Sequence, residues 1–459
     1  MIKSISEAFS EFCTGFDADR LSPEVVAALR WAVLDGIAAM LAGIAEPVSA
    51  QVLAAVSNTA GAGDCTVVGL GRRLPLRDAA FVNGTIAHAC DYDDSSWTMW
   101  GHPTAPLLPA LLACAEAWRF SGKNLLAAFA IGIEIEKALG LLMQPEHYRR
   151  GWHPTATLGL FGAVAGVGRQ LGLTIVQMEA AFGIAASMAA GLRCNAGYST
   201  KPLHAGFAAR SGLEAGLLAR AGISANQRAL ETEGGIFALY GASHPDRAAE
   251  VINQLGNPFE VIDPGLSPKL YPCCSDIHCA IDAVLDVKAE LGFTASDITA
   301  VRCFVGTMAE PNVRRRDPAT PAEAKFSMSY CVACAIVLGR VGLAQFTADA
   351  LAVEAVQSMA PRITTCIDPL LTDGSESFST PAAVEIDLRD GRCLRRVLRE
   401  MRGHPRRPLS SEDLRDKFFD CAKRALSASA SAELYTAICN LEKLPDILGL
   451  MQLAGGGQA

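Results

Sequence analysis

The segment SPEVVAALRWAVLDGIAAMLAG, from Ser22 to Gly43, decides the fold class. Ser22 is a favoured N-cap residue, and the proline that follows it suits the first turn of a helix. The apolar residues after it recur at helical spacing, and the run stops at Gly43. The segment therefore predicts one long helix in the N-terminal part of the chain.

Helical patterns continue on both sides of this segment. Further helices are predicted at 103–119, 124–142, 157–171, 174–190, 205–221, 410–425 and 432–444. Several of them are apolar almost all round, which is typical of the central helices of a bundle. Their many Gly and Ala residues favour close packing of helix backbones, and the sequence contains no glycine-rich phosphate loop.

The pattern changes after about residue 264. Residues 298–306 read as a strand, and two strand-like runs in 382–400 flank Asp390-Gly391, a strong hairpin signal. An apolar helix is predicted between them, at 322–339. A chain of 459 residues is also too long for one compact core. We therefore expect a mainly α fold, with a large all-helical domain made of both chain ends (1–265 and 405–459) and a smaller α/β domain inserted at 266–404.

Composition excludes several classes of protein. The net charge is −8 and no Lys/Arg-rich stripe is present, so nucleic acid is not an expected partner. The 15 cysteines are too few for a disulfide scaffold, and their odd number and apolar surroundings favour buried thiols in the cytoplasm. No membrane is expected either, because the apolar runs 158–168 and 180–192 are too short to span a bilayer. The mean hydropathy of +0.24 predicts a large core or a subunit interface.

The segment DYDDSSWTMWGHP, residues 91–103, places three carboxylates beside a histidine in a chain of which only 19% is charged. Asp91, Asp93 and Asp94 together suit a Mg²⁺-dependent diphosphate enzyme. That chemistry needs a second acidic cluster, and the sequence has only scattered single acids. Cysteines 331 and 334 lack a second pair at the spacing of a zinc site. We therefore predict no metal, and expect Asp93 and Asp94 to face water or cap helices.

Two histidines precede proline at the expected starts of long helices. Proline at the first helical position places the preceding imidazole, of His102 or His153, near a helix N-terminus, whose dipole favours the neutral ring. Other polar residues stand in three short segments: Lys201 and His204; Lys269, Tyr271 and His278; Lys325 and Tyr330. Together they supply bases, hydrogen-bond donors and cations without a cofactor motif. Proton transfer next to a carboxylate requires this combination.

Five segments resemble, in order, successive blocks of the MmgE/PrpD family. They are NGTIAHACDYDDSSWTMWGHPTAPLLPALLACAEA, GWHPTATLGLFGA, TKPLHAGFAARSG, KLYPCCSDIH and AKFSMSYCVACA. The family includes 2-methylcitrate dehydratase, cis-aconitate decarboxylase and iminodisuccinate epimerase, and the resemblance covers about residues 20–345. It implies a helical domain built from both termini with an inserted α/β lid, a homodimer, and no organic cofactor.

The resemblance also implies which residues line the pocket. By position these are Asp91, Ser95, His102, His153, Lys201, Lys269, His278 and Tyr330. Ser95 stands where threonine is expected in the decarboxylase and keeps its hydroxyl. The insert SWTMW before Gly101 is bulkier than the family pattern, which alters the expected pocket. RGWHPTATLGLFGA and GGIFALYGA look closest to the epimerase branch, while Tyr330 resembles the decarboxylase and dehydratase branch.

These residues predict a cofactor-independent lyase, a dehydratase or decarboxylase, that acts on a small di- or tricarboxylate. His102 and His153 would transfer the proton, Asp91 would orient His102, and Tyr330 would act at the reacting carbon. The expected carboxylate ligands are Lys201, Lys269 and His278, with Ser95 as a further substrate contact. The first alternative is an epimerase of an amino-dicarboxylate such as iminodisuccinate, which needs the same groups. The diphosphate enzyme and a non-catalytic helical scaffold are more remote.

Overall fold

Helix α2, Pro23–Gly43, lies where its capping signals predict it in the computed structural model, which describes residues 4–59, 61–371 and 380–456. The Ser22 side chain accepts a hydrogen bond from the Val25 amide, and Pro23 occupies the first turn. By length and composition α2 could also cross a membrane, and it is longer than the runs 158–168 and 180–192. However, 72% of its apolar window is buried inside the protein, as in a core helix.

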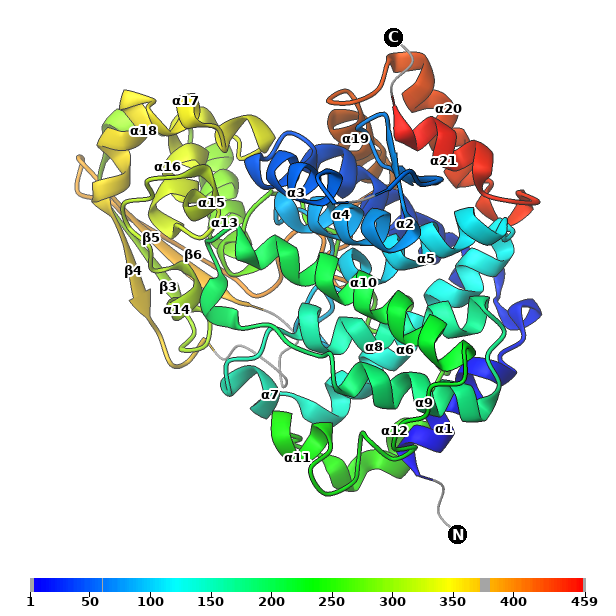
Figure 1. Cartoon of the computed structure of the whole chain (residues 1–459). Helices are drawn as coiled ribbons and strands as arrows, with labels where there is room; N and C mark the ends of the chain where they lie inside the picture. The colour runs from blue at the N-terminus through cyan, green and yellow to red at the C-terminus, as the bar shows by residue number, and fades with distance from the viewer. Residues whose placement is uncertain (1–3, 60, 372–379, 457–459) are drawn as a thin grey trace.

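The larger part of the molecule consists of helices (Figure 1). From the N-terminal half come α1 (Ile5–Gly15), α3 (Pro47–Ser57), α4 (Leu76–Ala89), α5 (Thr104–Trp118), α6 (Gly122–Met143), α7 (Glu146–Arg149), α8 (Pro154–Gln170), α9 (Ile175–Ala186), α10 (Thr200–Arg220), α11 (Ile236–Tyr240) and α12 (Ala248–Asn253). The C-terminal helices are α19 (Ser411–Ala422), α20 (Ala428–Cys439) and α21 (Leu448–Gly455). Residues of both chain ends share one hydrophobic core, in which Phe418 and Leu434 lie with Val33 and Leu41.

The smaller part contains a four-stranded sheet in the order β4-β3-β5-β6. Its strands are β3 (Ile298–Val305), β4 (Ile363–Ile367), β5 (Ala382–Leu388) and β6 (Cys393–Leu398). β3 pairs in parallel with β4 and antiparallel with β5, and β5 pairs antiparallel with β6. The predicted hairpin is confirmed, since Asp390 and Gly391 lie between β5 and β6 and Gly391 has a φ of +90°. A short antiparallel pair, β1 (Cys65–Val67) and β2 (Arg72–Leu74), lies in the helical part.

Helices lie beside this sheet in Figure 1 and contribute with it to a separate core. They are α13 (Ser275–Leu291), α14 (Glu310–Val313), α15 (Pro321–Ala324), α16 (Met328–Leu338), α17 (Ala348–Leu351) and α18 (Glu354–Met359). The single helix expected at 322–339 is interrupted, because Ser327 caps α16 by accepting from the Tyr330 amide. The buried residues of this core run from Tyr271 to Met401. We propose 266–404 as the inserted unit on this basis.

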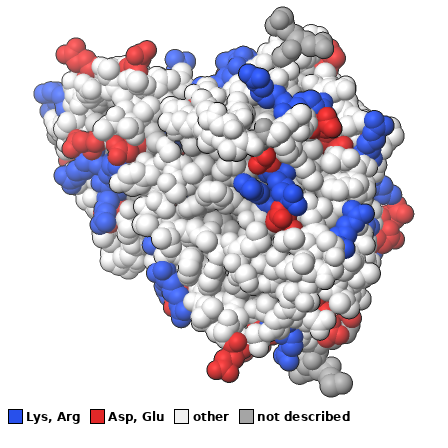
Figure 2. Space-filling view, viewed as in Figure 1, with Lys and Arg blue, Asp and Glu red and all other residues white. Residues whose placement is uncertain are grey.

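The charged residues visible in Figure 2 form small mixed groups separated by broad uncharged areas. Lysines and arginines lie next to aspartates and glutamates on this face, and no continuous basic stripe crosses it. Such mixed surface pairs are typical of a solvated surface and contribute little to stability.

Close helix packing explains several glycines and surrounds a buried acid. A Cβ atom at Gly162 of α8 would collide with the side chain of Glu136 on α6. Both carboxyl oxygens of Glu136 lack a hydrogen-bond partner among the described residues, and the side chain is 1% exposed. Burial, helped by the negative charges of Asp94 and Glu260, raises the pKa of Glu136 well above its ordinary value of 4.5. The folded protein therefore holds this carboxyl in its protonated form.

We expect Glu136→Gln to make the protein's stability less dependent on pH. A carboxyl whose pKa rises on folding contributes stability below its unfolded pKa, near 4.5, and loses this contribution as pH rises. The loss is at most about 1.4 kcal/mol per pH unit. Calorimetry should show that the Tm of the variant, relative to that of the wild type, is higher at pH 8 than at pH 5.5. An equal Tm difference at both pH values would mean that Glu136 is ionised in the folded state.

Candidate active site

A cavity of about 150 Å³ lies where the helical part meets the sheet-containing part. The helical part contributes Asp91, His102, His153, Arg193, Lys201 and His204 to its wall. The sheet-containing part contributes Lys269, Cys274, Ser275, Asp276, Asn312 and Phe326. The cavity is thus built by segments more than 200 residues apart.

Four helices begin at this cavity. His153 is the N-cap of α8, Lys201 is the second residue of α10, and Ser275 is the first residue of α13. His102 stands two residues before Thr104, the first residue of α5. The N-terminus of a helix carries a partial positive charge and unpaired amide donors, so the backbone favours an anion here. α10 begins at Thr200 rather than near 205, so Lys201 and His204 lie inside the helix and not before it.

Asp91 joins the two lysines of the cavity. Its carboxylate lies 2.5 Å from the Lys201 Nζ and 3.1 Å from the Lys269 Nζ, and Lys269 also donates to the Asp91 carbonyl at 3.0 Å. Burial raises the pKa of Asp91, but the two ammonium groups lower it more, so that it lies well below its ordinary value. Asp91 also has a φ of +52°, a strained conformation for a non-glycine residue. The ion pairs therefore hold an ionised carboxylate at the cavity wall.

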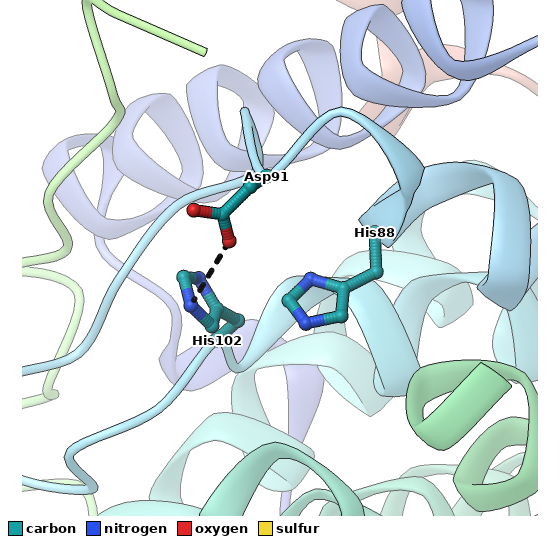
Figure 3. A group of neighbouring side chains, drawn as sticks. All are labelled: His88, Asp91 and His102. Carbon is teal, nitrogen blue, oxygen red and sulfur yellow. Dashed lines mark ion pairs between the residues drawn. The ribbon is translucent and has the colours of Figure 1, made fainter. Parts of the chain in front are cut away.

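His102 lies beside this carboxylate, with its Nε2 3.8 Å from the Asp91 Oδ1 (Figure 3). Its Nδ1 is 2.8 Å from the backbone carbonyl of Asp94, so Nδ1 carries the proton and donates it to that carbonyl. The Nε2 is then the basic nitrogen. Burial, and next the charge of Lys269, lower the pKa of His102 to about 3. Asp91 was expected to orient this ring, but the hydrogen bond that orients it comes from Asp94.

A second pair of imidazoles forms another part of the wall. The Nδ1 atoms of His153 and His204 lie 3.0 Å apart, so one ring donates and the other accepts. Burial, and next the charge of Lys201, lower the pKa of His153 well below its ordinary value. Burial also lowers the pKa of His204 to about 4. Both rings are therefore neutral near pH 7 in the unliganded protein.

His88, on α4, was not among the predicted site residues. Its Nδ1 lies 2.8 Å from the Asp93 Oδ2, and its ring centroid lies 4.8 Å from that of His102 and 5.7 Å from that of His153. Figure 3 shows the His88 ring beside His102 and Asp91. The signal in the sequence is its position one helical turn before Asp91.

The expectation that Asp93 and Asp94 face water is wrong. Asp93 is 1% exposed and pairs with His88, and Asp94 is 2% exposed. Asp94 does cap a helix, as the alternative expectation has it, since its carboxylate accepts from the Thr104 amide at 3.3 Å and from the Thr104 hydroxyl at 2.6 Å. Burial, and next the charge of Asp35, raise the pKa of Asp94 to about 7. Tertiary partners therefore replace the water that a polar loop normally contacts.

Two family models match most of the chain. The MmgE/PrpD N-terminal domain matches residues 7–248, and the MmgE/PrpD C-terminal domain matches residues 271–443. The chain belongs to the MmgE/PrpD family. The cis-aconitate decarboxylase of Homo sapiens is 31% identical, over 99% of this chain and 95% of that protein. The cis-aconitate decarboxylase of Mus musculus is 30% identical, over 99% of this chain and 94% of that protein. The cis-aconitate decarboxylase of Aspergillus terreus is 27% identical, over 97% of this chain and 95% of that protein. This similarity supports an enzyme.

Six of the eight site residues predicted from the MmgE/PrpD resemblance line the cavity. They are Asp91, Ser95, His102, His153, Lys201 and Lys269. The Ser95 hydroxyl lies 3.2 Å from that of Ser275, at the start of α13. Arg193, Tyr148 and His204 line the cavity as well and were not among the eight.

His278 and Tyr330 do not line the cavity. His278 is fully buried on α13, and its Nε2 donates to the Cys273 carbonyl at 3.2 Å. The Tyr330 hydroxyl donates to the Gln345 carbonyl, and its ring packs in the core beneath the sheet. Both side chains lie on the faces of α13 and α16 that are packed into this core. We therefore assign them no contact with a ligand in the cavity.

The geometry gives little support to a metal role in this MmgE/PrpD protein. His88, Asp91 and His102 offer ligand atoms within 4.8 Å of one another (Figure 3). However, the ammonium groups of Lys201 and Lys269 are already next to Asp91, and their charge repels a divalent cation. The three aspartates of residues 91–94 also bind different partners, which disfavours the diphosphate alternative.

Proposed function

We propose that the protein is a cofactor-independent lyase that decarboxylates cis-aconitate or a tricarboxylate of similar shape. One observation carries the proposal: a partly open, cationic cavity holds neutral imidazoles next to a carboxylate that is fixed between two lysines. Such a cavity attracts a polyanion and places bases and donors around it. The similarity to cis-aconitate decarboxylases favours decarboxylation over loss of water.

The chemistry needs one proton and a place for negative charge. In cis-aconitate, one carboxylate is carried by a methylene group next to the double bond. When CO₂ leaves, the electron pair of that C–C bond forms a new double bond. The electron pair of the old double bond then takes a proton at the carbon beside another carboxylate. A trianion and one proton thus give a dianion and CO₂.

The cavity residues match these two needs. Lys201, Lys269 and the helix N-termini stabilise negative charge that develops on the carboxylate next to the protonated carbon. The proton would come from His102 or His153. Both are neutral in the unliganded protein, but a bound polyanion raises the pKa of a neighbouring imidazole, so substrate binding favours the imidazolium that donates.

The proposal is tested by incubating EDTA-treated protein with cis-aconitate, 2-methylcitrate, citrate and iminodisuccinate separately and following each by proton NMR. Consumption of cis-aconitate with release of CO₂ supports the proposal. Loss of water from 2-methylcitrate or citrate would move the protein to the dehydratases, and inversion of iminodisuccinate without any loss would move it to the epimerases. If untreated protein turned over one of these acids and EDTA treatment abolished that turnover, the result would contradict a metal-independent reaction. The homodimer and the cytoplasmic location stay predictions.

A further inference from the structure

Arg193 differs from the other cations of the cavity, because no described acidic residue forms an ion pair with it. Lys201 and Lys269 both form ion pairs with Asp91, which offsets one of their two positive charges. Arg193 forms no ion pair within residues 4–59, 61–371 and 380–456, although it lines the same cavity. A cation that is partly withdrawn from water and lacks a counter-charge favours an anion from outside the protein.

A rigid platform holds the guanidinium. Its carbon lies 3.9 Å from the centroid of the Tyr148 ring, so the group stacks on that ring. Asn312 donates to the Tyr148 hydroxyl at 2.9 Å and to the Asp276 carboxylate at 2.8 Å. Tyr148 comes from the helical part and Asn312 from the sheet-containing part, so the platform spans the junction. This contact places the guanidinium over the Tyr148 ring before any ligand arrives.

The backbone places Arg193 close to the imidazoles. The Arg193 amide donates to the Gly151 carbonyl at 2.9 Å, and the His153 amide donates to the Gly191 carbonyl at 3.1 Å. In this antiparallel pairing Arg193 lies opposite Gly151 and His153 opposite Gly191, so Arg193 and His153 lie diagonally across the two segments, and both line the cavity. In addition, the Nη1 of Arg193 is buried and has no hydrogen-bond partner among the described residues. A buried guanidinium nitrogen without an acceptor is costly, and a carboxylate oxygen would satisfy it.

We propose that Arg193 binds a substrate carboxylate that Lys201 and Lys269 do not take, and so restricts the cavity to acids with at least two carboxylates. The inference rests on the proposed function, because it concerns the same cavity and the same class of substrate. A separate Arg193 site explains how the cavity can hold two carboxylates of one substrate at different positions. The planar, stacked guanidinium offers two parallel donors to the second carboxylate, which a lysine cannot do.

The test measures binding and not turnover. Calorimetry gives the affinities of tricarballylate, a saturated tricarboxylate, of glutarate, which lacks its central carboxylate, and of 2-methylsuccinate, which lacks a terminal one. Arg193→Met should weaken tricarballylate binding by about 10- to 100-fold, as expected for a lost charged hydrogen bond. The affinity of Arg193→Lys for tricarballylate should lie between those of the wild type and of Arg193→Met. Arg315→Met is the matched control, because Arg315 also lies over a tyrosine, Tyr198, but pairs with Glu323 outside the cavity.

The comparison of ligands decides the result. In the wild type, one of the two dicarboxylates should bind more weakly than tricarballylate, and Arg193→Met should remove that difference. An equal difference in the wild type and in Arg193→Met would overturn the inference, and so would the absence of wild-type binding to all three acids. If binding behaves as expected but the NMR assay shows no turnover of cis-aconitate, 2-methylcitrate, citrate or iminodisuccinate, the proposed reaction is wrong and the Arg193 site is still supported.

Discussion

Replacing His102 with asparagine is expected to lower kcat for cis-aconitate by about 10²–10⁴-fold, the usual contribution of a general acid or base. The asparagine amide can donate to the Asp94 carbonyl in place of the Nδ1, so the loop should keep its conformation. What the variant loses is the basic Nε2 at the cavity wall. Steady-state kinetics should therefore show the loss in kcat, with a smaller change in KM.

His147→Asn is the matched control for this variant. His147 is fully buried, bonds to the Tyr240 carbonyl and the Thr157 hydroxyl, and lies outside the cavity. Burial lowers the pKa of His147 to about 4, so it is also neutral near pH 7. The control should keep its kcat even if its stability falls. A His102→Asn enzyme with wild-type kcat would remove His102 from the proton transfer.

Asp91→Asn is expected to reduce stability and activity together. It leaves the buried ammonium groups of Lys201 and Lys269 without a counter-charge, which costs about 3–5 kcal/mol for a broken buried pair. The folded-state pKa of Asp91 is depressed, so its contribution is present above the unfolded pKa, near 3.8, and is lost as pH falls further. Urea unfolding at pH 7, followed by circular dichroism, should show the full decrease in the free energy of unfolding.

Glu46→Gln separates the two effects. The Glu46 carboxylate lies 2.9 Å from the buried Lys325 Nζ, and neither residue lines the cavity. This control should also lower the free energy of unfolding, but the folded variant should keep its kcat and KM. If Asp91→Asn lost stability alone and kept its catalytic constants, Asp91 would be only a structural residue.

Local signals in the sequence were sufficient where structure depends on neighbouring residues. Ser22 and Pro23 start α2 as predicted, and Asp390-Gly391 turns the hairpin as predicted, because capping and turn chemistry act over a few residues. The start of α10 was less visible. Pro202 is tolerated in the first turn of a helix, and Lys201 gives no apolar signal there.

The site could be predicted only as far as its motifs reach. Arg193 and Tyr148 meet by tertiary packing, and no pattern in the sequence connects them. Tyr330 and His278 lie on helices whose periodicity does not tell which apolar face meets the cavity and which meets the core. Asp93 has a polar neighbourhood in the sequence, but its contact with His88 decides its burial. Fold class thus follows from the sequence more completely than side-chain roles do.

The most direct test of the account is the fate of solvent hydrogen when the wild-type protein acts on cis-aconitate in D₂O. We predict release of CO₂ and a product with one deuterium, at a carbon beside a carboxylate, as detected by proton NMR and mass spectrometry. A product without deuterium would contradict proton delivery by groups that exchange with solvent. Deuterium in unreacted substrate without any loss of CO₂ would show that the cavity transfers protons but does not catalyse decarboxylation.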